Sequence, residues 1–152
     1  MTIQLANERG FSLTDLIATI GLIGVLSTLS VPNMLKYWQN STVNAGAHEF
    51  AAVLTRARTL AVTRNTAVCV QVAATTVTLH LVNCAGVAWT GPGTDSGGVF
   101  RLSNNLQIGG GATATFTSFG SAIPTATFTV TDPKTGLSRS VAVTATGRVT
   151  LQ

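Results

Sequence analysis

Three hydrophobic patterns follow one another along this chain of 152 residues. The first is a continuous apolar stretch, Leu16 to Leu35, twenty residues without a single charge. At a rise of ~1.5 Å per residue, a helix of that length spans roughly 30 Å, the thickness of the hydrocarbon core of a bilayer. No later stretch is comparable, so the sequence predicts one membrane-spanning helix near the N-terminus.

The second pattern is an apolar stripe whose members recur at alternating steps of four and three: Val43, Ala47, Phe50, Leu54, Ala57 and Ala61. This spacing places them on one side of a helix. The other side carries residues suited to water: Asn44, Glu49, Thr55, Arg56 and Thr59. We expect one helix from about Leu13 to Arg64. Pro32 should kink or loosen it, because proline has no N–H to donate.

The third pattern begins after Asn65 and consists of short runs rich in valine, threonine and phenylalanine. Such runs, separated by glycine, proline and aspartate, are typical of β-strands. We expect strands at 67–72, 77–82, 99–102, 114–119, 125–131, 138–143 and 146–151. The predicted fold class is α+β: the C-terminal half of the long helix packs on an antiparallel β-sheet. Four residues should form the sheet side of the core: Phe116, Phe119, Phe128 and Val130.

These patterns divide the chain into four parts. Residues 1–10 are a polar leader, 11–35 are a transmembrane segment, 36–65 are the amphipathic half of the same helix, and 66–152 are a β-sheet domain. An ordinary secretory signal would have a shorter apolar core followed by a small-residue cleavage site. No A-x-A pattern follows Leu35. The apolar segment is therefore expected to stay attached.

Charged residues make up 9% of the chain, and basic residues exceed acidic ones by four. A mildly cationic outer domain permits an anionic partner such as DNA without demanding one. With five acidic residues in all, paired-carboxylate catalysis is not expected. His48 and His80 are more often structural in such positions, and they do not form a metal-ligand spacing with the cysteines. We predict no enzyme activity, cofactor, metal or small-molecule substrate.

Two cysteines, Cys69 and Cys84, lie outside the apolar segment. In a domain exported past a membrane, two cysteines favour a disulfide. Closing this short loop would stabilise the fold by about 3 kcal/mol. The alternative is a pair of buried free thiols.

The junction after the leader reads Arg9-Gly10-Phe11-Ser12-Leu13-Thr14-Asp15-Leu16-Ile17. It resembles the cleavage signature of type IV prepilins: a polar leader ending in glycine, then phenylalanine, then an acid four positions on, then an apolar run. In that family a membrane prepilin peptidase cuts after the glycine and methylates the new amino group. The resemblance implies cleavage at Gly10–Phe11 and N-methylation of Phe11.

The acid in this junction, Asp15, needs a physical explanation. A carboxylate within a membrane-entering helix costs about 2.5–3.5 kcal/mol. Cleavage would create a cationic amine at Phe11, and Asp15 can pair with the amine of an adjacent subunit to set the assembly register. The family nearly always has glutamate there, so the shorter Asp15 puts efficient registration in question. The alternative is an N-cap aspartate on a plain membrane helix.

The later segments resemble the GspH/FimT branch of minor pilins and pseudopilins. The resemblance covers the end of the long helix, the strand after it, the Cys84 and Trp89-Thr90-Gly91 loop, and the terminal Thr146-Gly147-Arg148-Val149. Some FimT-like proteins bind DNA through a glycine-arginine motif with a second arginine two residues on. Here Thr150 occupies that second place.

A small basic face of Arg148, Arg139 and Lys134 could still bind DNA weakly and with salt sensitivity. Its alternative is a set of solvated side chains on a β surface.

The resemblance implies a minor pilin that is assembled into a type IV pilus, with a place at its tip. One alternative is the corresponding pseudopilin of a type II secretion system. Another is a DNA-binding minor pilin for DNA uptake. The expected partners are other pilins, the prepilin peptidase and the inner membrane. The expected location is the bacterial inner membrane, single-pass, with the C-terminal domain on the periplasmic or extracellular side, and the filament after assembly.

Overall fold

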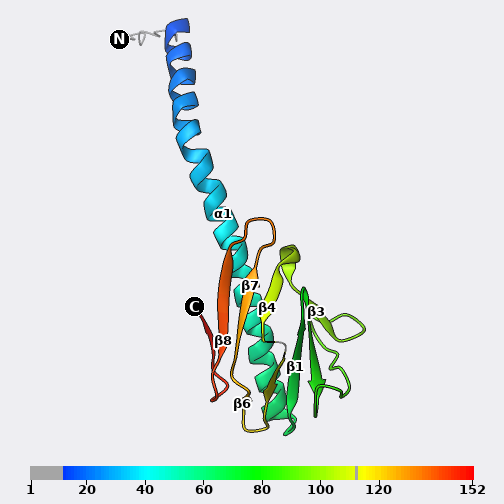
Figure 1. Cartoon of the computed structure of the whole chain (residues 1–152). Helices are drawn as coiled ribbons and strands as arrows, with labels where there is room; N and C mark the ends of the chain where they lie inside the picture. The colour runs from blue at the N-terminus through cyan, green and yellow to red at the C-terminus, as the bar shows by residue number, and fades with distance from the viewer. Residues whose placement is uncertain (1–11, 112) are drawn as a thin grey trace, which may run out of the picture. The chain divides into compact units, whose positions relative to one another are not determined.

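The structure is a computed structural model that describes residues 12–111 and 113–152, without the side chains of residues 29, 30 and 32 (Figure 1). The predicted leader and the predicted cleavage site at Gly10–Phe11 lie outside the described residues. The chain divides into two compact units, Met1–Trp38 and Gln39–Gln152. The two units differ in how far their apolar side chains are buried.

One helix, α1, runs from Leu13 to Thr63, as the hydrophobic pattern predicted. It begins where the Ser12 carbonyl accepts the N–H groups of Asp15 and Leu16. It ends at Thr63, and two residues later Asn65, with a positive φ of 49°, turns the chain away from the helix axis. The Thr66 N–H then donates to the Ala61 carbonyl at 3.1 Å and the Asn65 N–H to the Val62 carbonyl at 3.2 Å. These two bonds form a Schellman motif, which satisfies carbonyls that a helix end leaves open.

In the first unit, the apolar side chains of α1 are exposed: Leu13, Leu16, Ile17, Ile20, Leu22, Ile23, Val25, Leu26, Val31, Met34 and Leu35. No single helix in the described part of the chain is long and apolar enough to cross a membrane, although the bent pair Leu13–Thr28 and Asn33–Thr63 meets that criterion by length and composition alone. Pro32 lies within α1, and its loosening effect stays a prediction.

The second unit contains two antiparallel sheets. The first has the order β3-β2-β1-β5-β6 and the second the order β4-β7-β8-β9. Their bounds are β1 Val68–Ala73, β2 Thr76–Leu81, β3 Val99–Arg101, β4 Gln107–Gly110, β5 Thr113–Phe116, β6 Ala122–Ile123, β7 Ala126–Thr131, β8 Ser138–Val143 and β9 Val149–Leu151. A short 3₁₀ helix, η1, spans Ser103–Asn105. The part of α1 that belongs to this unit runs along the sheets (Figure 1).

Every strand that the sequence predicted is present, with boundaries that differ by at most three residues and coincide for 138–143. Two strands were not predicted, β4 and β6. Gly109 and Gly110 fill half of β4, and glycine is disfavoured in strands because it has no side chain to pack. The division into two sheets was also not predicted, because strand propensity does not say which strands pair.

The core lies between α1 and the sheets. All six members of the predicted helix stripe are buried, and the Phe50 and Phe128 rings meet edge to face with centroids 5.2 Å apart. Phe116, Phe128 and Val130 are buried as predicted. Burying one such aromatic side chain stabilises a fold by roughly 1.5–3 kcal/mol.

The prediction that Phe119 belongs to this core is wrong, because its side chain is 93% exposed. Strand β5 ends at Phe116, and Phe119 lies in the turn that follows. That turn is closed by a hydrogen bond from the Thr117 N–H to the Ser121 carbonyl at 2.8 Å.

Candidate functional site

The predicted assembly residue, Asp15, lies in the first turn of α1. Its side chain is exposed, and among the described residues it makes no hydrogen bond or ion pair. The apolar residues on either side, Leu13, Leu16 and Ile17, are exposed as well. A negative charge near a helix N-terminus is favourable because it faces the positive end of the helix dipole.

The predicted disulfide is confirmed. Cys69 in β1 is bonded to Cys84 in the loop after β2, with the Cα atoms 5.0 Å apart. The neighbouring His80 holds the same loop, because its Nδ1 lies 2.8 Å from the Gly86 carbonyl oxygen. His80 therefore has a structural place, as expected. Within the described residues no group of His, Cys, Asp and Glu could hold a metal ion.

The loop that contains Trp89 is fastened to α1 by an arginine. The Arg56 guanidinium lies 5.2 Å from the centroid of the Trp89 ring and donates a 2.6 Å hydrogen bond to the Pro92 carbonyl. Trp89 also stacks on Phe100 at 6.3 Å. A Cβ at Gly91 would run into the Trp89 ring, so glycine is required for this close approach. The tryptophan-glycine loop is thus packed against α1 and Phe100.

Two carboxylates organise turns. Asp132 accepts the Lys134 N–H and the Thr135 hydroxyl, both at 2.9 Å, and these bonds lower the pKa of the Asp132 carboxyl. The Val99 N–H, followed by the Gly97 N–H and the Arg101 charge, lowers the pKa of Asp95. Hydrogen bonds to the ionised form favour it. Both carboxylates stabilise the turns in which they lie.

A second arginine joins three segments at the C-terminal end of α1. Arg58 Nε donates a hydrogen bond to the Gly120 carbonyl at 3.0 Å, and Arg58 Nη2 donates one to the Thr146 carbonyl at 3.4 Å. Gly147 has a φ of 73°, and a Cβ there would run into the Gly120 carbonyl oxygen. The β5–β6 turn and the β8–β9 turn therefore meet on Arg58, and only glycine fits between them.

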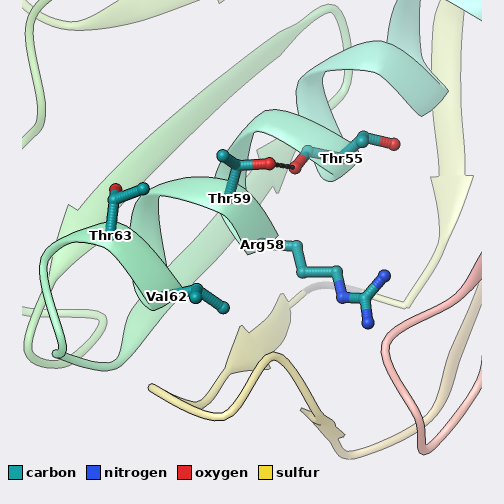
Figure 2. Close-up of a pocket in the computed structure, with 5 residues that line it drawn as sticks. All are labelled: Thr55, Arg58, Thr59, Val62 and Thr63. Atoms are coloured by element: carbon teal, nitrogen blue, oxygen red, sulfur yellow. Dashed lines mark hydrogen bonds between the residues drawn. The ribbon is translucent and has the colours of Figure 1, made fainter.

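Beside this junction lies a shallow groove of about 230 Å³ on α1, lined by Thr55, Arg58, Thr59, Val62 and Thr63 (Figure 2). The three threonine hydroxyls donate to carbonyls of the helix itself, those of Ala51, Thr55 and Leu60. With their hydroxyls occupied, the threonines offer methyl groups to the groove. We term this surface the threonine groove.

The threonine groove was not predicted from the sequence, because Thr55 and Thr59 were assigned to a side suited to water. The signal that could have found it is the i, i+4, i+8 spacing of Thr55, Thr59 and Thr63. Threonines at that spacing form a row along one face of a helix. In a helix they can satisfy their own hydroxyls at preceding carbonyls.

The three basic residues predicted to form one face do not lie together. Lys134 lies in the turn before β8 and Arg139 is the second residue of β8, whereas Arg148 lies beyond its other end. The Arg148 carbonyl accepts the Thr144 N–H at 3.0 Å. Residues 139 and 144 are five positions apart on an extended strand, or ~17 Å. Arg139 is also engaged, because its Nε donates to Asn44 Oδ1 at 2.7 Å.

No protein-family model and no curated protein matches the chain. The chain does match solved structures. The type IV minor pilin FimU of Pseudomonas aeruginosa aligns with a TM-score of 0.56 and 19% identity, over 76% of this chain and 92% of FimU. The minor pseudopilin EpsH from the Type 2 Secretion System of Vibrio cholerae aligns with a TM-score of 0.56 and 13% identity, over 72% of this chain and 95% of EpsH.

These alignments confirm the fold class that the prepilin-like junction implied. A long N-terminal helix on antiparallel sheets is the arrangement in FimU and EpsH as well as here. The chain therefore has the type IV pilin-like fold in the form found in GspH/FimT-like minor pilins and pseudopilins.

Proposed function

We propose that this chain is a non-enzymatic filament subunit, a minor pilin, which is trimmed between Gly10 and Phe11, methylated on Phe11 and assembled with other pilins. The observation that carries the proposal is the Asp15 carboxylate, which has no partner among the described residues and lies in the first turn of a helix whose first part, up to Trp38, has exposed apolar side chains. The fold shared with a minor pilin and a minor pseudopilin supports it.

The physical argument starts from the exposed apolar surface. Leu16, Ile17, Ile20 and their neighbours need either lipid or other apolar helices around them. Before assembly, the inner membrane would supply lipid, with the β-sheet unit on its outer side. In the filament, neighbouring helices would replace the lipid. Asp15 would then pair with the methylated amine of an adjacent subunit, and in a low-dielectric core the loss of either partner is costly.

We place the chain in a type IV pilus rather than in a secretion pseudopilus. The loop with Cys84 and Trp89 supports this choice, since it resembles the cysteine and tryptophan-glycine loop of type IV pilus members. FimU and EpsH align with the same TM-score of 0.56, so the fold does not favour either role. Deleting the gene in the native host distinguishes the two roles. Loss of surface filaments with intact protein secretion is the expected result, and the reverse pattern assigns the chain to secretion.

DNA capture is the weaker alternative. It would rest on Arg148, which the fold separates from Lys134 and from the already bonded Arg139. Fewer phosphate contacts mean weaker binding and a smaller dependence of the affinity on salt. A mobility-shift assay with Arg148→Ala as the control decides it, and we expect no shift at physiological salt.

The test of the assembly role compares two substitutions of the same residue. Asp15→Ala removes the carboxylate, and Asp15→Glu keeps it one methylene further out. We expect Asp15→Ala to be made and folded but absent from sheared filaments, and Asp15→Glu to be incorporated at least as well as the original chain. Formation of the Cys69–Cys84 disulfide serves as the folding control. Equal incorporation of Asp15→Ala would contradict the proposal.

A further inference from the structure

The turn next to the threonine groove holds an aromatic side chain out of the protein. Phe119 is 93% exposed, and its turn is fixed by bonds from the Gly120 N–H to the Thr117 carbonyl at 2.8 Å and between the Thr117 and Ser121 hydroxyls at 2.6 Å. Arg58 holds the same turn through the Gly120 carbonyl. The backbone that carries this exposed ring is already held in place, so less of it has to be ordered when the ring binds a partner.

Phe119 and the threonine groove are parts of one apolar surface. A Cβ at Gly120 would lie 3.2 Å from Val62 Cγ2, so the turn rests on a residue that lines the groove. Val62 is 50% exposed, and Ile123, which follows the turn, is 67% exposed. Exposed apolar surface collected in this way marks sites of interaction.

Unpaired positive charge borders this surface. Arg64 follows the groove at the end of α1, and Arg148 follows Gly147, which packs on the Gly120 carbonyl. Among the described residues, neither guanidinium has a hydrogen-bond or ion-pair partner. None of the residues that line the groove or form the two turns is acidic. The surface thus combines apolar contact with unneutralised cations.

We infer that the threonine groove and Phe119 dock an acidic, apolar segment of a different protein, with Arg64 and Arg148 pairing its carboxylates. The unit 39–152 of a second copy of this chain fits poorly. It has three acidic side chains, and Glu49, Asp95 and Asp132 all accept hydrogen bonds within their own chain. Nucleic acid fits less well than a peptide, because methyl groups and aliphatic side chains line most of the surface and only one aromatic ring is offered for base stacking.

This inference goes beyond the assembly role. It concerns the unit 39–152 and would stand if Asp15 had no part in a filament. Proteolytic trimming and docking are measured independently, so the failure of one does not imply the failure of the other.

The experiment is photo-cross-linking of the full chain in its native host, with p-benzoylphenylalanine in place of Phe119. The control places the same probe at Val87, which is 78% exposed on a different loop. We expect an adduct with another protein from position 119 only. Mass spectrometry of the cross-linked peptide should show aspartate or glutamate next to an apolar residue.

Charge reversal provides the second arm. Combining Arg64→Glu with Arg148→Glu should lower the adduct yield at least ~10-fold, because like charges would then face each other. The matched control combines Lys134→Glu with Arg139→Glu, which changes the net charge equally at a distant place and should leave the yield unchanged. An adduct that withstands the first reversal, that contains a second copy of this chain, that is removed by nuclease, or that forms equally from position 87 would overturn the inference.

Discussion

The two halves of α1 differ in where their apolar side chains go. In residues 39–63 the apolar positions form a narrow stripe, and every member from Val43 to Ala61 is buried by the sheets of the same chain. In residues 13–38 apolar side chains occupy more than half of the positions and are not confined to one stripe, and those of Leu16, Ile20 and Ile23 are more than half exposed. A one-sided stripe needs one partner surface, whereas a helix that is apolar all round needs surroundings that are apolar all round.

This difference indicates what stabilises each half. The stripe contributes to the folding of the unit 39–152, so its loss should appear as a loss of stability. The exposed half contributes to an association with lipid or other subunits, so its loss should leave folding intact. Substitutions that separate these two effects test the comparison.

The largest effect is expected from Phe50→Ala. Removing a fully buried ring that contacts Phe128 should lower the unfolding free energy by about 3–5 kcal/mol. The matched change in the other half, Ile20→Ala, should leave it unchanged, because Ile20 is 61% exposed. Denaturant unfolding in mild detergent, followed by near-ultraviolet circular dichroism, measures both. Equal destabilisation by the two substitutions would break the comparison.

The second-largest effect is expected from reducing the disulfide. The cysteines are 15 residues apart in sequence, and closing a loop of that length stabilises a fold by about 3 kcal/mol. Reducing the Cys69–Cys84 bond should lower the thermal midpoint of the unit 39–152 and leave the helicity of residues 13–38 unchanged. A chain with Cys69→Ala and Cys84→Ala serves as the control, since reductant should have no further effect on it.

Gly147→Ala should destabilise the junction at Arg58 by roughly 1–3 kcal/mol, because it adds strain at a positive φ and also brings a Cβ against the Gly120 carbonyl oxygen. Gly136→Ala is the control. Gly136 has a similar φ of 72°, but a Cβ there would meet nothing within 4 Å. The difference between the two thermal midpoints therefore reports the contact with the Gly120 carbonyl. If the two variants are equally stable, the close packing of the two turns is refuted.

Acid should have the smallest effect. The pKa values of Asp95 and Asp132 are lowered below 3.8 by the hydrogen bonds that the carboxylates accept. Groups with a lowered folded-state pKa stabilise the fold above their unfolded pKa, and that contribution disappears as the pH falls through the folded pKa. The thermal midpoint should thus begin to fall below about pH 4. Asp132→Asn should weaken this dependence, and an unaltered profile would show that the Asp132 turn does not titrate as described.

The sequence predicted the parts of the fold that periodicity encodes. The helix stripe and most strands follow from the spacing of apolar residues, and Phe50, Leu54 and Phe128 are buried as expected. Phe119 shows the limit of that approach. It was included in the strand expected at 114–119, yet β5 stops at Phe116, because pairing with β1 ends at Val68. Where a strand ends depends on its partner, which local sequence does not reveal.

The candidate site residues also divide into those that the local sequence reveals and those that depend on contacts between distant segments. Asp15 and the cysteines could be identified because a charge in an apolar run and a pair of exported cysteines are rare. Arg58 could not be identified in this way, because its hydrogen bonds go to residues 62 and 88 positions further along the chain. The predicted basic face was incomplete for a similar reason: Arg139 and Arg148 are close in sequence but lie toward opposite ends of β8.

The mass of the mature chain tests the central claim most directly. Purified from a host with an active prepilin peptidase, the protein should lack residues 1–10 and carry one methyl group on the amino group of Phe11. Such a chain would have the cationic terminus that Asp15 needs as a partner. A protein that keeps its first ten residues would contradict the account and leave a membrane-tethered β domain without a filament role.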